Sequence, residues 1–295
     1  MSAAVGRIAA LNDQAKGILC MIAGVLVLTT QDAITKWLTA GYHAGEIMFY
    51  RGLFSFIPIA VLLWREGGAA GMRSRRPALN LVRALLALAT SVLIVTAFAH
   101  MPLADVLAVV FASPLILTAL SGPLLGEHVG WRRWSAVGVG FVGVLLLTRP
   151  GTGALDLAVL LPLGAAFFSA LRDITTRRLG GHASPTTILL YTQAVATLAA
   201  APSLAVNSGW PGLLDWLLFA AAGILVGLAH YLIIQAFLFA QAVAIAPFRY
   251  LALVWAMLIG FLVWGDVPDL WAIAGSSLIV GSGLYMLHRE TRRRR

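Results

Sequence analysis

A few charged side chains interrupt stretches of sequence that are otherwise apolar, and their types and spacing limit the chemistry open to this chain. Asp32 and Lys36 are four residues apart, so they share one face of a helix. A charge placed in hydrocarbon is costly unless it finds a partner or a water-filled cavity. Two interpretations fit: Asp32 binds a cationic group or a proton inside a cavity, or it neutralises Lys36, whose ammonium extends to the outer surface.

Two arginines and one aspartate lie near the ends of neighbouring apolar runs. Arg51 lies about a turn and a half into its run, where it binds substrate or pairs with Glu46 or Asp105. Arg83 is close enough to the inner surface for its long side chain to reach water. Asp105 either benefits from the dipole at a helix N-terminus or carries a coupling proton. We assign a coupling or gating role to Lys36, Arg51, Arg83 and Asp105.

The second half of the chain holds two further polar pairs at membrane depth. His230 and Tyr231 fall near the middle of one apolar run, and ionisable groups at that depth commonly serve binding or proton transfer. Arg249 and Tyr250 follow Pro247, which frees a backbone carbonyl and bends its helix toward a cavity.

Arg249 needs an anion at this depth, and the candidates are Asp32, a substrate carboxylate or a carbonyl at a helix C-terminus. Tyr191 and Trp255 offer ring stacking and hydrogen bonds, although Tyr and Trp also form interfacial belts. A proton is the candidate coupling ion, carried by Asp32, Asp105 or His230. The predicted substrate-binding residues are Asp32, Arg249, His230, Tyr231, Tyr191, Trp255 and Tyr250.

Membrane-spanning helices must position these residues. Hydrophobic residues make up 60% of the 295 positions and charged residues 11%, whereas an ordinary soluble domain has about 25% charged residues. Several apolar runs are continuous and reach the roughly 20 residues that cross a bilayer as a helix, which excludes the alternating pattern of a β-barrel. The expected fold class is all-α integral membrane. We predict ten helices, over residues 17–38, 44–64, 78–99, 103–125, 131–148, 154–173, 185–206, 213–239, 243–264 and 270–288.

The basic residues indicate the orientation. The net charge is +9, and 16 of the 21 lysines and arginines fall in segments that the ten-helix arrangement puts on one side of the membrane. By the positive-inside rule that side is cytoplasmic, and both termini lie on it. Because topology explains the basicity, nucleic-acid binding is not expected, although the C-terminal arginines can contact anionic lipid headgroups. The 16 residues are Arg7, Lys16, Arg65, Arg73, Arg75, Arg76, Arg132, Arg133, Arg172, Arg177, Arg178, Arg289 and Arg292 to Arg295.

One stretch of the first half recurs in the second half. A shift of 139 residues lays residues 97–127 on residues 236–266, which matches an Ala-Phe helix end, a tight turn, one span, and then a glycine followed by a carboxylate. The closing pairs are Gly126–Glu127 and Gly265–Asp266. Five helices per half is an odd number, so two halves of one fold must cross the membrane in opposite senses. We therefore predict two inverted five-helix repeats.

The repeats are expected to divide the chain into residues 1–150 and 151–295, with the substrate held between them near the midplane, as in secondary transporters. The sequence holds no His-Glu-x-x-His motif, no Gly-x-Ser-x-Gly elbow and no phosphate-binding Gly-x-x-x-x-Gly-Lys motif, so an enzyme is not expected. The histidines lack metal-ligand spacing, and neither a metal nor a cofactor is expected. A channel or a structural membrane subunit stays open as an alternative.

Short motifs also carry a family resemblance along nearly the whole chain. They include Asp32-Ala-Ile-Thr-Lys36, Pro102-Leu-Ala-Asp105, Gly126-Glu127, Gly227 to Tyr231, Ala246-Pro-Phe-Arg-Tyr250 and Gly265-Asp266. With these motifs the chain resembles the drug/metabolite transporter superfamily, in its EamA branch, and within that branch the bacterial S-adenosylmethionine uptake carriers. Arg249 departs from the pattern, because an uncharged small residue is expected there in many relatives.

The resemblance implies a ten-helix transporter of the bacterial inner membrane that works by alternating access. Its implied substrate is a small organic metabolite, such as an amino acid, S-adenosylmethionine or a related amine or zwitterion. An exporter of drugs or metabolites with the same fold is the alternative within the family.

Overall fold

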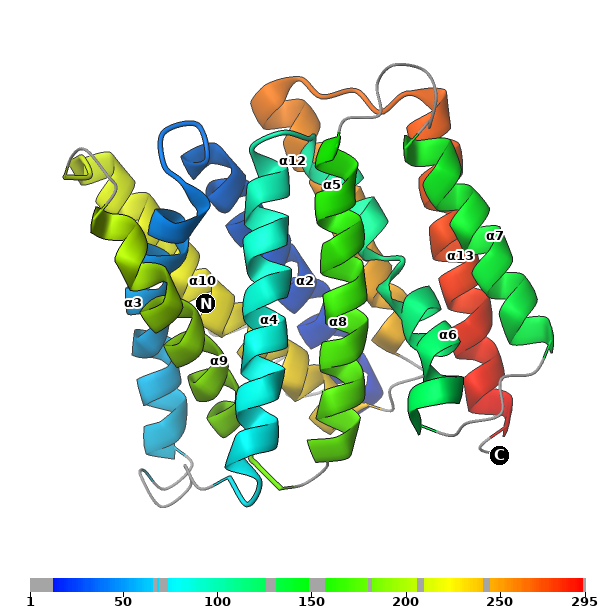
Figure 1. Ribbon diagram of the computed structural model, residues 1–295, viewed down its shortest axis with the longest axis horizontal. Coiled ribbons are helices and arrows are strands. Elements are labelled where there is room, and N and C mark those ends of the chain that lie inside the picture. Colours follow the sequence, from blue (N-terminus) through cyan, green and yellow to red (C-terminus); the bar gives the residue numbers. More distant parts are fainter. Residues whose placement is uncertain are drawn as a thin grey trace.

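The protein is a bundle of helices that run up and down between two ends (Figure 1). The computed structural model describes residues 13–65, 68, 74–125, 131–148, 157–179, 182–205, 210–240 and 245–293. The helices are α2 (Asp13–Leu38), α3 (Ala44–Arg65), α4 (Pro77–Phe98), α5 (Leu103–Val110), α6 (Ser113–Leu125), α7 (Trp131–Thr148), α8 (Leu160–Leu179), α9 (Pro185–Ala200), α10 (Leu213–Phe239), α12 (Leu251–Trp264) and α13 (Leu270–Arg293). Three 3-10 helices are η2 (Leu157–Val159), η3 (Ala201–Ala205) and η4 (Ala246–Tyr250).

These helices make the ten predicted crossings. Among the described residues, seven helical stretches are long and apolar enough to span a bilayer, and α7 and α13 contain shorter apolar stretches. The remaining crossing is α8, which is less apolar because its second half carries charged residues. The all-α integral-membrane class is confirmed, and the bounds of α7 and α10 coincide with the predicted ones.

Two predicted helices are broken. The span predicted over residues 103–125 is interrupted at Phe111, between α5 and α6. The cause is Pro114 in the first turn of α6, which cannot donate the backbone hydrogen bond that a continuous helix needs. The span predicted over residues 243–264 likewise contains the 3-10 helix η4 around Pro247 before it becomes α-helical. Discontinuous helices at equivalent places of two repeats are typical of transporter binding regions.

One predicted helix ends too early. It was expected over residues 154–173, with the following arginines in a cytoplasmic loop, but α8 continues to Leu179. Arg172 contacts the Asp173 carboxylate at 3.1 Å and donates to Ser169 Oγ at 2.8 Å. Because these polar groups satisfy one another, the helix does not have to end where the charges begin.

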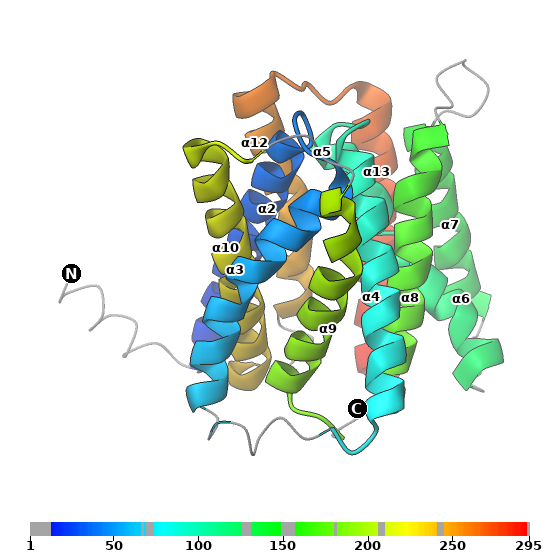
Figure 2. The same ribbon diagram turned by 60° about the vertical axis from the view of Figure 1, so that its left-hand side comes forward.

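The two halves cross the bundle in opposite senses, as predicted. We call the end at which α2, α4 and α12 finish the upper end, and the end at which α6, α8 and α10 finish the lower end (Figures 1 and 2). Gly126 and Glu127 lie outside the described residues, but α6, which precedes them, ends opposite to α12. Gly265 has a φ of 71° and closes α12 in the left-handed conformation that favours glycine. The division at residue 150 stays a prediction.

The helix contacts also repeat when each helix is replaced by its counterpart in the other half. α2 packs on α10 as α8 packs on α4, α3 packs on α10 as α9 packs on α4, and α12 packs on α2 as α6 packs on α8. The pairs α3–α9 and α7–α13 are their own counterparts. The shift of 139 residues carries Phe111 onto Tyr250, and the centroids of these two rings are 5.1 Å apart. The axis that relates the two halves therefore passes between Phe111 and Tyr250.

Close contact of small residues holds α7 against α13. Large apolar side chains such as Leu262, which is 70% exposed, face outward, and lipid is as apolar as they are. Helix association in a bilayer therefore depends on contact packing rather than on removal of apolar surface from water. A Cβ built on Gly275 would lie 2.6 Å from the carbonyl oxygen of Gly143, and a Cβ on Gly143 would lie 2.8 Å from that of Gly275.

Replacing Gly275 by alanine is expected to lower the melting temperature of the purified protein, because the added methyl group overlaps the backbone of α7. Overpacking of this kind costs about 1–3 kcal/mol. Gly281→Ala on the same helix is the matched control, since nothing lies within 4 Å of its Cβ position. Thermal unfolding in detergent measures both variants, and equal melting temperatures would contradict the packing described.

Candidate functional site

A polar cluster joins α2 to α3 in the upper part of the bundle. The charge of Asp32 acts on Arg51, which is the basic group that its carboxylate feels most. Arg51 Nη1 donates to Thr35 Oγ1 at 3.4 Å, and Gln31 Nε2 donates to the same oxygen at 2.6 Å. Asp32 and Arg51 are each half-buried. The sequence suggested Lys36 or Arg249 for Asp32 and Glu46 or Asp105 for Arg51, whereas in the structure the charges of Asp32 and Arg51 act on each other.

Lys36 extends away from this cluster toward the second half of the chain. Its ammonium donates to the carbonyl oxygen of Met101 at 2.6 Å and lies 5.1 Å from the centroid of the Trp264 ring. The carboxylates of Asp266 and Asp105 act on it from a longer distance. Lys36 is therefore an interface residue between the repeats rather than the neutralising partner of Asp32.

Arg83 holds three helices together in the lower part of the bundle. Its Nε donates to Thr176 Oγ1 at 2.8 Å on α8, and its Nη1 donates to Thr192 Oγ1 at 2.9 Å on α9. The guanidinium thus binds inside the bundle and does not extend past the helix end into water. By donating to hydroxyl groups on α8 and α9, Arg83 of α4 helps to hold these three helices together.

The two arginine–threonine junctions are counterparts of one another. Exchange of the halves carries α2, α3 and α10 onto α8, α9 and α4. Thr35 and Thr176 each lie close to the end of their helix, and Arg51 and Thr192 are both the eighth residue of theirs. The arginine comes from α3 in the upper junction and from α4 in the lower one. The bundle therefore carries one cationic, hydroxyl-bonded group toward each end.

His230 on α10 connects the two junctions electrostatically. The charges of Arg172, Arg83 and Arg51 all act on its ring. Its Nδ1 lies 2.7 Å from the carbonyl oxygen of Val226, and because a carbonyl only accepts, Nδ1 carries the proton. Nε2 of the neutral ring is then a hydrogen-bond acceptor. Of His230 and Tyr231, the two residues predicted on α10, it is His230 that makes this hydrogen bond and experiences these charges.

The other predicted residues lie apart from this cluster. Arg249 is exposed in η4 at the lower end of the α12 crossing, and Tyr250 packs against Phe111 with tilted ring planes and covers Gly283. Trp255 on α12 packs in an apolar cluster with its indole Nε1 buried and, among the described residues, without a hydrogen-bond partner. Tyr191 is half-buried on α9. The roles assigned to these residues stay predictions.

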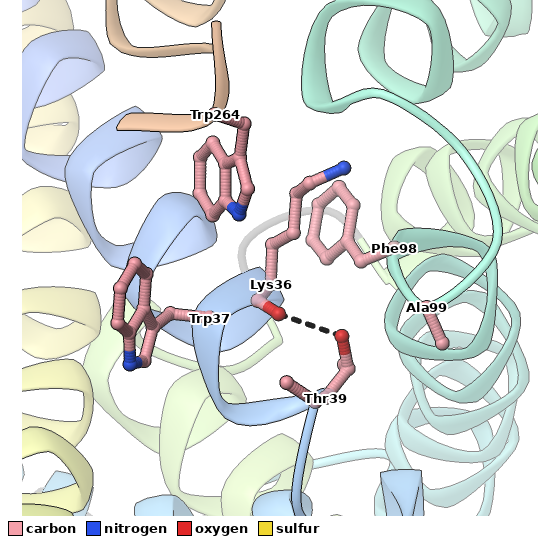
Figure 3. A pocket seen from close by; sticks show the side chains of 7 residues that line it. Lys36, Trp37, Thr39, Phe98, Ala99 and Trp264 are labelled. Carbon is pink, nitrogen blue, oxygen red and sulfur yellow. Dashed lines mark hydrogen bonds between the residues drawn. The ribbon is translucent and has the colours of Figure 1, made fainter. Parts of the chain in front are cut away.

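A pocket of about 290 Å³ opens at the upper ends of α2, α4 and α12, where the two halves meet (Figure 3). Sequence reasoning identified only Lys36 among its lining residues. A signal for two others was present, since Phe98 and Trp264 stand close to the ends of the two recurring stretches. The lining residues are Lys36, Trp37, Thr39, Ala40, Phe98, Ala99 and Trp264.

The equivalent corner at the lower end is tied shut. Arg178 Nη2 on α8 donates to the carbonyl oxygen of Leu124 on α6 at 2.5 Å, and Arg76 Nη1 donates to the carbonyl oxygen of Arg178 at 3.4 Å. Since α8 and α6 are the counterparts of α2 and α12, equivalent corners differ among the described residues: a pocket lies beside Lys36 at the upper end, and Arg178 joins α8 to α6 at the lower end.

A second pair of contacts, one at each end of the bundle, links connections between helices of the two halves. At the lower end the Arg75 amide donates to the carbonyl oxygen of His182 at 2.8 Å. At the upper end Tyr42 Oη donates to Asp215 Oδ2 at 2.7 Å, which links the α2–α3 connection to α10. Burial and the hydrogen bond to Asp215 raise the pKa of Tyr42 to about 12, so the phenol stays a donor at neutral pH.

Charge coupling between Asp32 and Arg51 is testable in a double-mutant cycle. Asp32→Asn or Arg51→Gln alone leaves an uncompensated charge in the bundle, whereas the double variant removes both charges. We expect the double variant to be more stable than the sum of the single losses predicts, by about 0.5–3 kcal/mol. Thermal unfolding of the four proteins measures the coupling energy, and strictly additive losses would mean that the two charges do not interact.

Comparisons with known proteins agree with this architecture. The family model described as the EamA-like transporter family matches residues 15–149 and 156–287, once in each half. The chain is 30% identical over 286 residues to the riboflavin transporter of Rhizobium johnstonii, an alignment that covers 95% of this chain and 93% of that protein.

Other relatives have different named substrates. The S-adenosylmethionine uptake transporter of Rickettsia prowazekii is 25% identical over 281 residues, covering 95% of each chain. The pseudopaline exporter of Pseudomonas aeruginosa is 30% identical over 266 residues, covering 90% of this chain and 93% of its own. A solved crystal structure of another protein matches with a TM-score of 0.64 at 18% identity, over 95% of this chain and 98% of that one, which shows a shared fold.

Proposed function

The chain belongs to the EamA-like transporter family of the drug/metabolite transporter superfamily, and from this premise we propose that it is a secondary active transporter. It moves a small organic metabolite across the bacterial inner membrane by alternating access, with both termini in the cytoplasm. The observation that supports the proposal is the difference between two equivalent corners: a pocket lies beside Lys36 at the upper end, and Arg178 bonds the Leu124 carbonyl at the lower end. Two inverted halves that exchange these conformations would open the bundle to either side in turn.

The substrate that fits the interior best is an amine or a zwitterion. Asp32 is the carboxylate that meets a cationic group, and its half-buried position between α2 and α3 leaves it open to a ligand. Arg249, exposed at the lower end, meets a carboxylate where the substrate leaves toward the cytoplasm. His230, Tyr231, Tyr191, Trp255 and Tyr250 shape the route between them. The S-adenosylmethionine carriers among the relatives support this class, because that metabolite carries both an amine and a carboxylate.

Proton coupling through Asp32, Asp105 or His230 supplies the driving force in this proposal. Lys36, Arg51 and Arg83 hold the interface between the halves and change partners when it opens. Export is the second candidate for direction, since the pseudopaline relative is named an exporter while the S-adenosylmethionine relatives are named uptake transporters.

Counterflow in proteoliposomes tests the transport function and the role of Asp32 together. Vesicles preloaded with one unlabelled metabolite from a panel of amino acids, S-adenosylmethionine and vitamins should accelerate entry of the same labelled compound. Asp32→Asn is expected to lose this exchange because the amide cannot pair with a cation, while the variant, although less stable, is still recovered as folded protein. Asp13→Asn is the control, since Asp13 lies on the same helix with a side chain that is 74% exposed. A channel would show no acceleration by internal substrate.

Closure of the lower end is expected to depend on Arg178. A cysteine in place of Ala99 reports whether the upper pocket is open, in a Cys20→Ser background that removes the natural thiol. Arg178→Ala removes one hydrogen bond of about 1 kcal/mol, which shifts the equilibrium between the two states about fivefold, and should slow labelling of this cysteine by an impermeant maleimide by up to that factor.

Arg65→Ala, at the lower end of α3, is the matched control for this measurement and should leave the labelling rate unchanged. Equal rates in the Arg178 variant and the unmodified reporter would separate the lower contact from the opening of the upper pocket, and the alternating mechanism would lose its main support.

A further inference from the structure

We propose that the pocket around Lys36 binds a planar heteroaromatic ring that presents hydrogen-bond acceptors along one edge. The inference rests on the proposed transport function, because the pocket would be the first binding site that a substrate entering from the upper end reaches. It assigns a substrate class from the pocket alone, which lies one helical turn above Asp32.

Aromatic rings from three helices surround the pocket (Figure 3). Trp37 comes from α2, Phe98 from the end of α4 and Trp264 from the end of α12, so both halves of the chain contribute. The two indole rings have centroids 6.3 Å apart and planes inclined by 48°, which leaves their faces unstacked. Indole faces and edges gain most from another aromatic ring, which therefore fits this pocket better than an aliphatic chain does.

The Lys36 ammonium supplies the polar contact. Of its three N–H donors one is used on the Met101 carbonyl, and within the described ranges the ammonium forms no ion pair. Two donors are thus available to ring carbonyls or ring nitrogens of a ligand. Thr39 Oγ1 donates to the backbone oxygen of Lys36, so its own oxygen can accept only from a ligand N–H.

The position of the ammonium argues against a cationic ligand. The Lys36 ammonium lies over one face of Trp264 at 5.1 Å from the ring centroid, so the other face and the edge are left for a ligand ring, and a cation finds no closed aromatic cage. Lys36 is the charged residue in the pocket lining and repels a cation at close range, while the Asp266 and Asp105 carboxylates act on it from outside the lining. An interfacial belt does not account for Trp264, because belt residues face lipid headgroups, whereas Trp264 is half-buried against Lys36; Trp37 is the more exposed of the two indoles.

The size of the pocket agrees with a ring rather than with a whole extended metabolite. Its volume of about 290 Å³ is at the small end of ligand sites. Asp32 lies on the same face of α2, about 6 Å deeper by helix rise. A metabolite that combines a heteroaromatic ring with an amine can therefore place the ring at Lys36 and the amine near Asp32.

Two fluorescent tricyclic dyes of similar shape test the proposal on the full-length protein in detergent. Lumiflavin has two ring carbonyls on one edge and no charge, and proflavine is cationic and has no carbonyl. Lumiflavin should bind with a Kd at least about tenfold lower than proflavine, with its fluorescence quenched by the pocket tryptophans. Lys36→Met should weaken lumiflavin binding and remove the difference between the dyes, whereas Lys36→Arg should retain both.

Trp264→Leu should weaken lumiflavin binding about tenfold as well, while Trp64→Leu, whose side chain is 80% exposed and outside the pocket, should not. Tighter binding of proflavine, or unchanged lumiflavin binding in both the Lys36→Met and Trp264→Leu variants, would overturn the proposal. Counterflow measured on the same preparations keeps the two claims apart. Exchange that continues at the wild-type rate in Trp264→Leu would remove the ring site and leave the transport function standing.

Discussion

Hydrocarbon offers no hydrogen bonds, so every polar group inside the bundle has to be satisfied by the bundle itself. For its buried arginines the structure meets this constraint with side chains that reach across helix boundaries, whereas Trp255 Nε1 is buried without a partner among the described residues. Arg83 donates hydrogen bonds to hydroxyl groups on two other helices. Arg51 donates to the Thr35 hydroxyl and interacts with the charge of Asp32. Each such contact also fixes the position of one helix against another, so the polar residues determine how the helices pack.

The same constraint explains why the two ends of the molecule can differ while the halves share one plan. At the lower end, Arg178 donates to the carbonyl oxygen of Leu124 near the C-terminus of α6. The lysine at the corresponding upper corner instead bonds Met101 and leaves a pocket beside Trp264. Either arrangement satisfies a cation with a carbonyl. Two solutions of similar chemistry at equivalent places are what an alternating transporter requires, because each end must be able to adopt the arrangement of the other.

Sequence alone predicted the helical class, the ten crossings and the inverted senses, because continuous apolar runs and their count are local properties. It did not predict the break at Phe111, which depends on Pro114 within a run that otherwise has the length of a full span, nor the continuation of α8 beyond Asp173 to Leu179. Charged residues usually mark a helix end in water, but here they satisfy one another inside the helix. The pocket residues were missed for another reason: Trp37, Phe98 and Trp264 are ordinary apolar residues in sequence, and only the crossing of α2, α4 and α12 brings them to Lys36.

The contact of Phe111 with Tyr250 has a consequence for motion. Residues at equivalent positions of two inverted repeats that touch each other sit on the pivot, where a rocking movement displaces atoms least. In the proposed alternating-access mechanism this contact would persist while the helix ends on either side move apart, and the ring pair would act as the pivot. A change to one ring would alter both swings equally, since neither compartment is nearer to it than the other.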